Sequence, residues 1–424
     1  MSFNTISVIG LGYIGLPTAA MFASKKKQVV GVDVNQSVVD TINAGGIHII
    51  EPELDILVSA AVTEGYLRVV TAPEPADAFL IAVPTPFLSS SEKSDIPQPD
   101  LKFVESAARA IAAVLKKGDL VILESTCPVG TTERMAVWLA EERSDLTFPQ
   151  THGFESDIRV AHCPERVLPG HVVRELVEND RIIGGMTENC SKAAIELYKI
   201  FVRGDCIVTN ARTAEMAKLT ENASRDVSIA FANELSIICD KLNIDVWELI
   251  ELSNRHPRVN ILQPGPGVGG HCIAVDPWFI ASAAPEEAQL ITAARRVNNA
   301  KPNWVFEKVK LALANYLLAN PNKSAADVKI ACYGLAFKAN IDDLRESPAL
   351  QIADKICDLP VGQVLLIEPN ISELPKKYDQ TLLVDYGGVD VEADIHVLLV
   401  DHDDFKKRQP KATIVIDTKG IWSD

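Results

Sequence analysis

The sequence predicts an α/β protein in which two blocks of alternating strands and helices flank a long helical region. Three observations support this. Short β-branched runs alternate with helical stretches in the first half, long helical patterns replace them from about residue 213, and strand patterns return after residue 323. Such alternation is typical of a doubly wound parallel sheet. At 424 residues the chain can form two or three domains with full-sized cores.

The first block contains five apolar runs that indicate buried strands of a parallel sheet. These runs are TISVIG, VVGVD, FLIAVP, LVILEST and RVAHCP. Helical patterns such as LPTAAMFASK and KFVESAARAIAAVLKK lie between them. The polar, proline-containing segment 87–100 follows a strand end, which is where ligands of such sheets bind.

The middle of the chain predicts helices over 213–243, 246–255 and about 286–318. In the last block, VKIACYGLAF, QVLLIEP, ADIHVLLVD and ATIVID indicate strands, and this block shares no motif-level repeat with the first. We therefore expect three regions. They are an α/β domain over 1–205, a helical region over 206–320, and a second α/β domain over 321–424.

Composition excludes several classes of protein. A net charge of −16 argues against a partner that is a nucleic acid or a membrane surface. No apolar run reaches the roughly 18–20 residues that a spanning helix needs, and the N-terminus runs directly into a strand pattern without a signal peptide. The eight cysteines are scattered and include no C-x-x-C pair, which favours reduced thiols. We expect a cytoplasmic protein.

The segment SVIGLGYIGLPTAA carries Gly10, Gly12 and Gly15 between a strand and an apolar helix. In this setting the glycines allow a tight turn and a close approach of the backbone to a pyrophosphate at a helix N-terminus. The next strand ends in Asp33, whose carboxylate can accept both ribose hydroxyls. No arginine follows it to bind a 2′-phosphate, so the cofactor predicted is NAD rather than NADP.

A second G-x-G-x-x-G, formed by Gly265, Gly267 and Gly270, lacks that setting. No convincing strand precedes it, Pro266 lies inside it, and no acidic strand end follows at the right distance. We expect these glycines to bring the backbone close to a different ligand or to leave one side chain clear.

Cys272 follows this glycine-rich backbone and is a candidate nucleophile, since a nearby cation or donor would raise its thiolate fraction. The alternative is a buried, small apolar residue. The adjacent His271 is expected to point to the other side of the chain and to serve packing or hydrogen bonding rather than a Cys–His dyad.

Lys218, Asn222 and Asp226 recur at four-residue spacing and form one polar stripe on an otherwise apolar helix. One interpretation is that these residues form a solvent-exposed face of the helix. The functional interpretation is that the lysine and the amide stabilise an oxyanion or hold a water. Asp276, four residues after Cys272, could then act as a general base or orient the lysine.

The last block opens with GLAFKANIDDLRESP, which places Lys338 and Arg345 after a strand, where open sheets bind anions. Acidic neighbours also permit a surface cluster of ion pairs. The acidic segment DHDD at 401–404 is read as a strand-end loop, and no metal is assigned.

Taken together and in order, seven motifs resemble the UDP-sugar 6-dehydrogenase superfamily over essentially the whole chain. They are GLGYIGLP, VPTP, ESTCPVGT, CPERVLPG, TAEMAKLTEN, GPGVGGHCIAVDP and GLAFKANIDDLRESP. The resemblance implies two Rossmann-like doubly wound domains, of which 1–205 binds NAD and 321–424 binds the UDP-sugar. The central helical region over 206–320 links them, carries the Cys272 loop and forms a homodimer. It also implies that a sugar C6 alcohol is oxidised to a carboxylate with two NAD per turnover and without release of aldehyde.

The resemblance assigns roles to individual residues. Cys272 matches the nucleophile, Lys218 and Asn222 match the pair that stabilises an oxyanion and positions water, and Asp276 matches the carboxylate paired with that lysine. Thr126 and Glu165 match residues near the nicotinamide and the hydrolytic water. The expected cofactor-binding residues are Gly10, Gly12, Tyr13, Ile14, Gly15, Asp33, Thr85, Thr126 and Arg345. The expected substrate-binding residues are Glu165, Arg166, Val167, Lys218, Asn222, Arg258, Gly265, Gly267, Gly269, Gly270 and Lys338.

Two departures from the UDP-glucose pattern bear on the substrate. Arg166 stands where an aromatic residue is typical, and Val275 stands where a lysine is typical. Both resemble the branch that oxidises N-acetylated UDP-hexosamines, and the stretch 256–278 is most similar to enzymes acting on UDP-N-acetyl-D-mannosamine for surface glycans of the enterobacterial common antigen type. UDP-GlcNAc, UDP-GalNAc or UDP-glucose, or a regulator that binds NAD and a UDP-sugar without turnover, are the alternatives. Arg258 is expected to reach the substrate of the partner subunit, and Lys419 replaces an arginine common among relatives.

Overall fold

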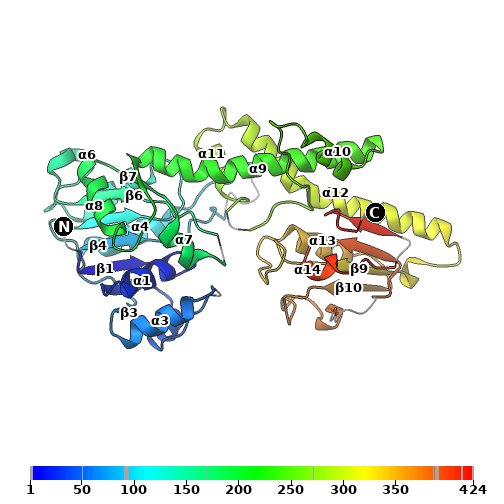
Figure 1. The fold of residues 1–424 in the computed structure, drawn as a ribbon, viewed down its shortest axis with the longest axis horizontal. Coiled ribbons are helices and arrows are strands. Elements are labelled where there is room, and N and C mark those ends of the chain that lie inside the picture. The colour runs from blue at the N-terminus through cyan, green and yellow to red at the C-terminus, as the bar shows by residue number, and fades with distance from the viewer. Residues whose placement is uncertain are drawn as a thin grey trace. The chain divides into compact units, whose positions relative to one another are not determined.

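The computed structural model describes residues 3–49, 51–89, 95–168, 170–270, 272–384, 386, 391–411 and 414–422. By its internal contacts the chain divides into two compact units (Figure 1). The first consists of residues 1–221 with 278–285, and the second of residues 222–277 with 286–424. Each unit is described by itself.

An eight-stranded sheet forms the centre of the first unit, in the order β3-β2-β1-β4-β5-β6-β7-β8. Its first six strands follow the Rossmann order 3-2-1-4-5-6. All neighbours pair in parallel except β6 and β7. The strands are β1 (Thr5–Ile9), β2 (Gln28–Val32), β3 (Leu67–Val70), β4 (Ala78–Ile81), β5 (Leu120–Leu123), β6 (Arg159–His162), β7 (Arg181–Gly185) and β8 (Cys206–Asn210).

The five predicted strands of this block are confirmed as β1, β2, β4, β5 and β6. Three others were missed, and two of these, β3 and β8, are the edge strands of the sheet. On β8 the apolar side chains of Ile207 and Val208 are exposed, so the strand lacks the buried apolar run that marks the central strands. Because β8 pairs with β7, the sheet extends to Asn210.

Helices cover both faces of this sheet, and each face has its own apolar core. On β4, Ala78 and Leu80 belong to one core, whereas Phe79 and Ile81 belong to the other. Side chains alternate across a strand, so a strand that is buried on both faces needs an unbroken apolar run. The helices are α1 (Gly15–Ser24), α2 (Gln36–Asn43), α3 (Leu54–Thr63), α4 (Lys102–Ala112), α5 (Thr131–Glu142), α6 (Pro149–His152), α7 (Val172–Glu178) and α8 (Glu188–Tyr198).

Long helices follow, as the sequence predicts. α9 (Ala211–Leu242) begins in the first unit and continues into the second, and α10 (Val246–Ser253) and α12 (Gln289–Ala319) belong to the second unit. The short α11 (Asp276–Ala283) was not predicted. Among the described residues, no helix combines the length and the apolar character that a membrane span requires.

The second unit contains a four-stranded parallel sheet in the order β10-β9-β11-β12. All four of its strands were predicted. They are β9 (Lys329–Tyr333), β10 (Gln363–Ile367), β11 (Ile395–Leu398) and β12 (Val415–Asp417), with the helices α13 (Pro348–Cys357) and α14 (Asp403–Lys406). Figure 1 shows α12 in yellow beside this sheet, and Val305 and Val309 of α12 pack in one core with Ile330 of β9 and Ile352 of α13.

The end of the described chain packs against α10. Gly420 has a φ of +68°, and a Cβ atom there would lie 2.4 Å from ring atoms of Trp247. Only glycine fits such a contact without displacing the indole. The last α/β block and the helical region therefore share one packed surface inside the second unit.

Candidate active site

The loop between β1 and α1 has the geometry that a dinucleotide needs, and each of its glycines meets a different requirement. Gly10 has a φ of +87°, and its Cβ would lie 2.7 Å from the carbonyl oxygen of Ala82. A Cβ on Gly15 would lie 1.8 Å from the carbonyl oxygen of Gly10. Gly12 is exposed and has no atom within 4 Å of a Cβ position. The turn is thus tight at two glycines and open at the third, as a pyrophosphate requires.

Asp33 lies at the end of β2 and its carboxylate faces this loop. Its Oδ2 accepts a hydrogen bond of 3.1 Å from the Leu11 backbone N–H, and its Oδ1 accepts one of 2.9 Å from Asn35. These bonds fix the carboxylate beside the glycine loop, where the ribose of a bound NAD would lie. Tyr13 is exposed and Ile14 precedes the first turn of α1 in the same loop.

Thr85 and Thr126 come from the loops after β4 and β5, which are neighbouring strands. The Thr85 hydroxyl donates to the Thr126 carbonyl oxygen at 2.6 Å. The two threonines therefore meet at the carboxyl edge of the sheet, where open α/β sheets bind ligands. Both are partly exposed, so this edge is accessible in the first unit.

Glu165 follows β6 and is held by two donors. Its Oε2 accepts from Arg181 Nη2 at 2.7 Å and its Oε1 accepts from the Arg166 backbone N–H at 2.7 Å. Arg181 also lies 3.6 Å from Glu124 and 4.2 Å from the ring centre of Tyr198. Burial raises the pKa of Glu124 to about 7, while Arg181 opposes this rise. The carboxylate of Glu165 is thereby fixed in orientation by a buried arginine.

Sequence reasoning missed Arg181. The available signal was a lone arginine that opens the apolar strand RIIGG, because a charge at a buried strand position requires a partner. The predicted substrate residues next to Glu165 lie at the protein surface of the same unit. Arg166 forms a salt bridge of 2.6 Å with Glu221, and Val167 is half-buried.

Cys272 and Asp276 lie in one turn at the start of α11. The Cys272 carbonyl oxygen accepts hydrogen bonds from the backbone N–H groups of Val275 and Asp276. The Cys272 side chain is exposed, so packing in the core is not its role. Asp276 is buried, and its Oδ2 accepts a 2.5 Å hydrogen bond from Asn222 Nδ2. His271, predicted to pack or hydrogen-bond, lies outside the described residues.

On α9, Lys218 precedes Asn222 by four residues, so both side chains project from the same face of the helix. The third member of the predicted stripe differs. Asp226 is fully buried and pairs with Arg295 Nη1 at 2.6 Å, so the interpretation of the stripe as a solvent-exposed face is wrong for this residue. The stripe changes from half-buried side chains at Lys218 and Asn222 to a fully buried ion pair at Asp226.

The loop 264–270 packs tightly inside the second unit. A Cβ at Gly267 would lie 2.9 Å from Pro348, one at Gly269 would lie 2.4 Å from the Glu346 carbonyl oxygen, and one at Gly270 would lie 3.1 Å from Phe337. In the described part of the chain, no strand lies between α10 and this loop, so the second G-x-G-x-x-G lacks the strand–turn–helix setting of a dinucleotide fingerprint, as predicted. Its glycines allow close packing of backbone rather than a Rossmann turn.

The remaining predicted residues of the second unit are surface cations. Lys338 and Arg258 are exposed, and Arg345 pairs with Asp343 at 2.6 Å. Lys419 forms a 3.1 Å salt bridge with Asp401, and its Nζ would lie 3.6 Å from a Cβ at Gly265. Lys419 is therefore the cation beside the start of the glycine loop.

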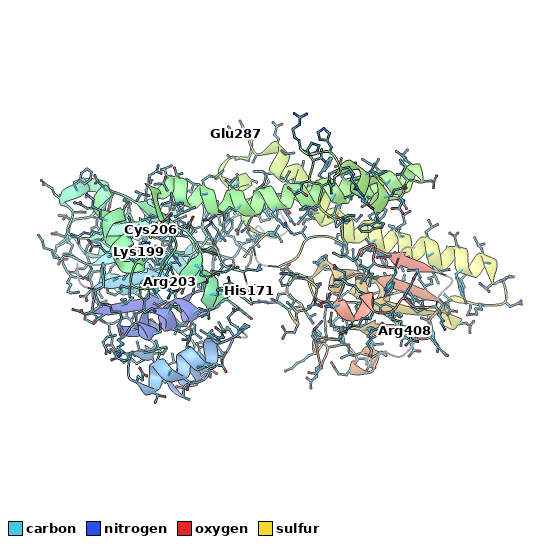
Figure 2. The ribbon with its side chains drawn as sticks, in the orientation of Figure 1. His171, Lys199, Arg203, Cys206, Glu287 and Arg408 are labelled. Carbon is cyan, nitrogen blue, oxygen red and sulfur yellow. The ribbon has the colours of Figure 1, made fainter. Side chains whose placement is uncertain are left out.

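The cysteines differ in exposure, and Cys272 is the exposed one of the eight. Cys206, labelled in Figure 2 beside Lys199, is half-buried, and burial raises the pKa of its thiol. Burial likewise raises the pKa of Cys357 to about 11. Thiols such as these are poor nucleophiles at neutral pH, which leaves Cys272 as the best-placed candidate.

Cys127, His162 and Glu215 form a buried group whose ligand-type atoms lie within 4.8 Å of one another. The Glu215 carboxylate already accepts from the Gly130 N–H at 2.6 Å, the Thr132 N–H at 2.8 Å and the Thr132 hydroxyl at 2.6 Å. Glu215 thus caps the first turn of α5, and we assign it that structural role.

Comparison with known proteins agrees with this arrangement. Three models of one family match the chain: the NAD-binding domain over residues 4–202, the central domain over 212–300 and the UDP-binding domain over 331–424. The chain belongs to the UDP-glucose/GDP-mannose dehydrogenase family. It is accordingly an NAD-dependent UDP-sugar dehydrogenase with a Rossmann domain, a central helical region and a UDP-binding domain.

Individual relatives of this dehydrogenase match over their whole length. A UDP-N-acetyl-D-mannosamine dehydrogenase of Yersinia pestis is 63% identical over 100% of both chains. An NDP-N-acetyl-D-galactosaminuronic acid dehydrogenase of Ralstonia nicotianae is 62% identical over 100% of this chain and 97% of its own. The solved UDP-D-ManNAc dehydrogenase from Pyrococcus horikoshii is 40% identical, with a TM-score of 0.84, and the match covers 99% of this chain and 96% of that chain.

Proposed function

We propose that the protein oxidises the C6 alcohol of UDP-N-acetyl-D-mannosamine to the carboxylate, with Cys272 as covalent nucleophile. The observation that carries the proposal is the turn Cys272–Asp276. It presents an exposed thiol four residues from a buried carboxylate, which is hydrogen-bonded to the amide of Asn222. The full-length similarity to UDP-N-acetyl-D-mannosamine dehydrogenases supports the choice of sugar.

The cofactor is held by the chain's own loop. Gly10, Gly12 and Gly15 leave room for the pyrophosphate, and Asp33 is placed to accept the ribose hydroxyls. Tyr13, Ile14, Thr85, Thr126 and Arg345 complete the proposed set. Bound NAD supplies the hydride acceptor, and two NAD per turnover are needed for a four-electron oxidation.

The thiol keeps the intermediate on the protein. After the first oxidation the sulfur of Cys272 adds to the aldehyde carbon and forms a thiohemiacetal, so that no aldehyde escapes. The second oxidation leaves a thioester. A water then attacks the carbonyl carbon, the C–S bond breaks, and the thiol and the carboxylic acid are formed.

Residues of α9, of the start of α11 and of the segment after β6 are proposed to stabilise the charges of these steps. We propose that Lys218 and Asn222 stabilise the oxyanion of each tetrahedral stage, and that Asp276 fixes the Asn222 amide through their hydrogen bond. Glu165 accepts from Arg181 and from the Arg166 N–H, and we propose that it orients the hydrolytic water. The loop 264–270, Val167, Arg258 and Lys338 are proposed to contact the UDP-sugar.

A second substrate is favoured by one specific observation. The Ralstonia NDP-N-acetyl-D-galactosaminuronic acid dehydrogenase matches at 62%, close to the 63% of the Yersinia enzyme. The second candidate is therefore oxidation of an N-acetylgalactosamine nucleotide by the same steps.

We further propose a homodimer formed by the central helices and a cytoplasmic role in supplying uronates for surface polysaccharides of the enterobacterial common antigen type. Full-length similarity to an Escherichia coli UDP-N-acetyl-D-mannosamine dehydrogenase supports the sugar that such a role would need. The division at 1–205, 206–320 and 321–424 is proposed for its three parts, and the spans of the three family models support it.

The decisive experiment titrates NADH formed per UDP-sugar consumed, with pure UDP-ManNAc, UDP-GlcNAc, UDP-GalNAc and UDP-glucose. Two NADH per UDP-ManNAc support the proposal, whereas one indicates a simple alcohol dehydrogenase and none indicates a binding protein. A faster reaction with UDP-GalNAc would favour the second candidate. A Cys272→Ser variant that still makes the uronate at the full rate would overturn the thioester mechanism.

A further inference from the structure

The glycine loop is tied to α9 by one buried side chain. Asn233 Oδ1 accepts a 2.9 Å hydrogen bond from the Gly265 backbone N–H. Asn233 is fully buried, and Pro264, Gly265 and Pro266 are buried with it. A buried backbone N–H needs an acceptor, and Asn233 provides it at the residue where the glycine-rich segment begins.

The orientation of the Asn233 amide is fixed by its neighbours on α12. Its Nδ2 donates to Asn298 Oδ1 at 2.9 Å. Asn298 in turn uses its own Nδ2 to donate to Asp226 Oδ1 at 2.7 Å, so only its oxygen is left for Asn233. Asn233 must therefore present its nitrogen to Asn298 and its oxygen to Gly265.

Asp226, the last residue in this series of hydrogen bonds, also forms an ion pair. Asp226 Oδ1 also accepts from Arg295 Nη1 at 2.6 Å, and Asp226, Asn298 and Arg295 are all at most 2% exposed. A polar network of this kind, which is buried on every side, gives each member a defined geometry. Asp226 and Arg295 thus determine, through Asn298, which way the Asn233 amide points.

The loop is held at a second place by another asparagine. Asn254, at the end of α10, accepts from the Ile261 N–H at 2.7 Å and donates to the Ile261 carbonyl oxygen at 3.0 Å. Beyond Gly265, Gly267 packs against Pro302 and Pro348, which are rigid side chains. The segment from Ile261 to Gly267 is therefore bounded by fixed contacts, of which Asn233 provides the one to α9.

We propose that Asn233 is a positioning residue, which sets the backbone of loop 264–270 for the UDP-sugar by means of the buried network Asp226–Arg295–Asn298. This inference rests on the proposed function for the identity of the ligand. Asn233 itself touches the loop backbone and not the reacting atoms.

The test uses Asn233→Ala in the full-length protein. Hydrogen exchange of the peptide spanning 261–270 is measured without ligand, and the Kd for UDP and the KM for UDP-ManNAc and for NAD are measured next. We expect faster exchange in this peptide. We also expect the Kd and the UDP-ManNAc KM to rise about fivefold, the factor that corresponds to one ordinary hydrogen bond, with the KM for NAD unchanged.

Ser236→Ala is the matched control, because Ser236 lies on the same helix and is buried, and its hydroxyl donates to the Asn233 carbonyl oxygen and accepts from the buried Lys301. It removes buried hydrogen bonds from α9 but leaves the Asn233 amide in place. We expect it to leave the UDP-ManNAc KM unchanged. If Asn233→Ala does not fold, Asn298→Leu removes the partner that orients Asn233 and should raise the same two constants by a smaller factor.

Unchanged exchange in 261–270 would overturn the proposal, as would faster exchange with unchanged Kd for UDP. An equal rise in KM for UDP-ManNAc and NAD would also overturn it, since that indicates general loosening. The exchange and UDP-binding measurements need no turnover. A wild-type protein that binds UDP but forms no NADH would therefore contradict the proposed function and leave this inference open to its own test.

Discussion

Arg181 and Glu165 form a buried salt bridge of 2.7 Å, with only 3% and 7% of their side chains exposed. Replacing Arg181 with Gln would leave both Glu165 and Glu124 without their cation. Breaking one partner of a buried ion pair typically costs about 3–5 kcal/mol. We therefore expect Arg181→Gln to lower the melting temperature by several degrees and to slow the hydrolytic half of the reaction, as measured by thermal unfolding and by thioester accumulation on Cys272.

The control for this experiment is Arg174→Gln, which removes an exposed salt bridge to Glu178 on α7. Exposed pairs contribute little to stability, so melting should not change. An Arg181→Gln variant that melts with the wild type and hydrolyses its thioester at the normal rate would contradict the role assigned to the pair.

Gly12 and Gly15 should respond differently to alanine. A Cβ on Gly12 meets no atom within 4 Å, whereas one on Gly15 would lie 1.8 Å from the Gly10 carbonyl oxygen. We expect Gly12→Ala to melt like the wild type but to bind NAD more weakly, by roughly tenfold or more, because the methyl group occupies the pyrophosphate position. Gly15→Ala should lower the melting temperature itself. Calorimetric titration with NAD measures the binding, and thermal unfolding measures the stability of each variant. Equal melting temperatures of the two variants would refute the different roles assigned to the two glycines.

Asn222 and Asp276 should act as a unit in turnover. Removal of one oxyanion donor typically lowers kcat by about 10²–10³-fold, so we expect Asn222→Ala to lower kcat with little change in KM. Because Asp276 accepts from the Asn222 amide, the Asn222→Ala/Asp276→Ala double variant should lose less than the product of the two single losses. Ser228→Ala is the control, since Ser228 lies on the same helix and its hydroxyl donates to the Ser224 carbonyl oxygen one turn earlier. Fully multiplicative losses would show that the two side chains act independently.

His162 predicts a dependence of stability on pH. Burial lowers the pKa of His162 to about 3, and the Leu123 backbone opposes this shift only in part. The unfolded chain binds a proton near pH 6.5 and the folded chain does not, so the free energy of unfolding falls as pH falls below about 6.5. Between pH 7 and 5 the loss is about 2 kcal/mol. Denaturant unfolding should show this slope for the wild type and for the exposed His152→Gln, but a smaller one for His162→Phe. Identical slopes of stability against pH in all three proteins would contradict this prediction.

Local pattern was enough to predict the strands and helices that carry the site. The first sheet begins with a buried apolar strand, a glycine turn and an apolar helix, all within about 20 residues, and Asp33 follows from the next strand. Cys272 and Asp276 were found in the same way, because they share one turn. In each case the residues that determine the geometry are neighbours in the chain.

Contacts between distant residues were not predictable. Arg295 lies 69 positions beyond Asp226, and nothing in either local pattern indicates that they pair. Asn233 stands in the ordinary helical stretch FANELSII, and only the folded chain brings it to Gly265. Edge strand β8 was not predicted, because its apolar residues are exposed and do not form the buried apolar run of a central strand. The sequence therefore indicated the candidate reacting groups better than the groups that hold them.

The packing of Gly420 against Trp247 has a consequence for protein engineering. An exchange of the last α/β block between relatives, as a way to change nucleotide-sugar preference, would carry Gly420 but leave Trp247 behind. In a chimera with its junction after α12, the C-terminal block and α10 would come from different proteins. Their contacting surfaces would then not be matched to each other. A graft that transfers α10 together with the C-terminal block keeps the indole and its glycine as one inherited pair.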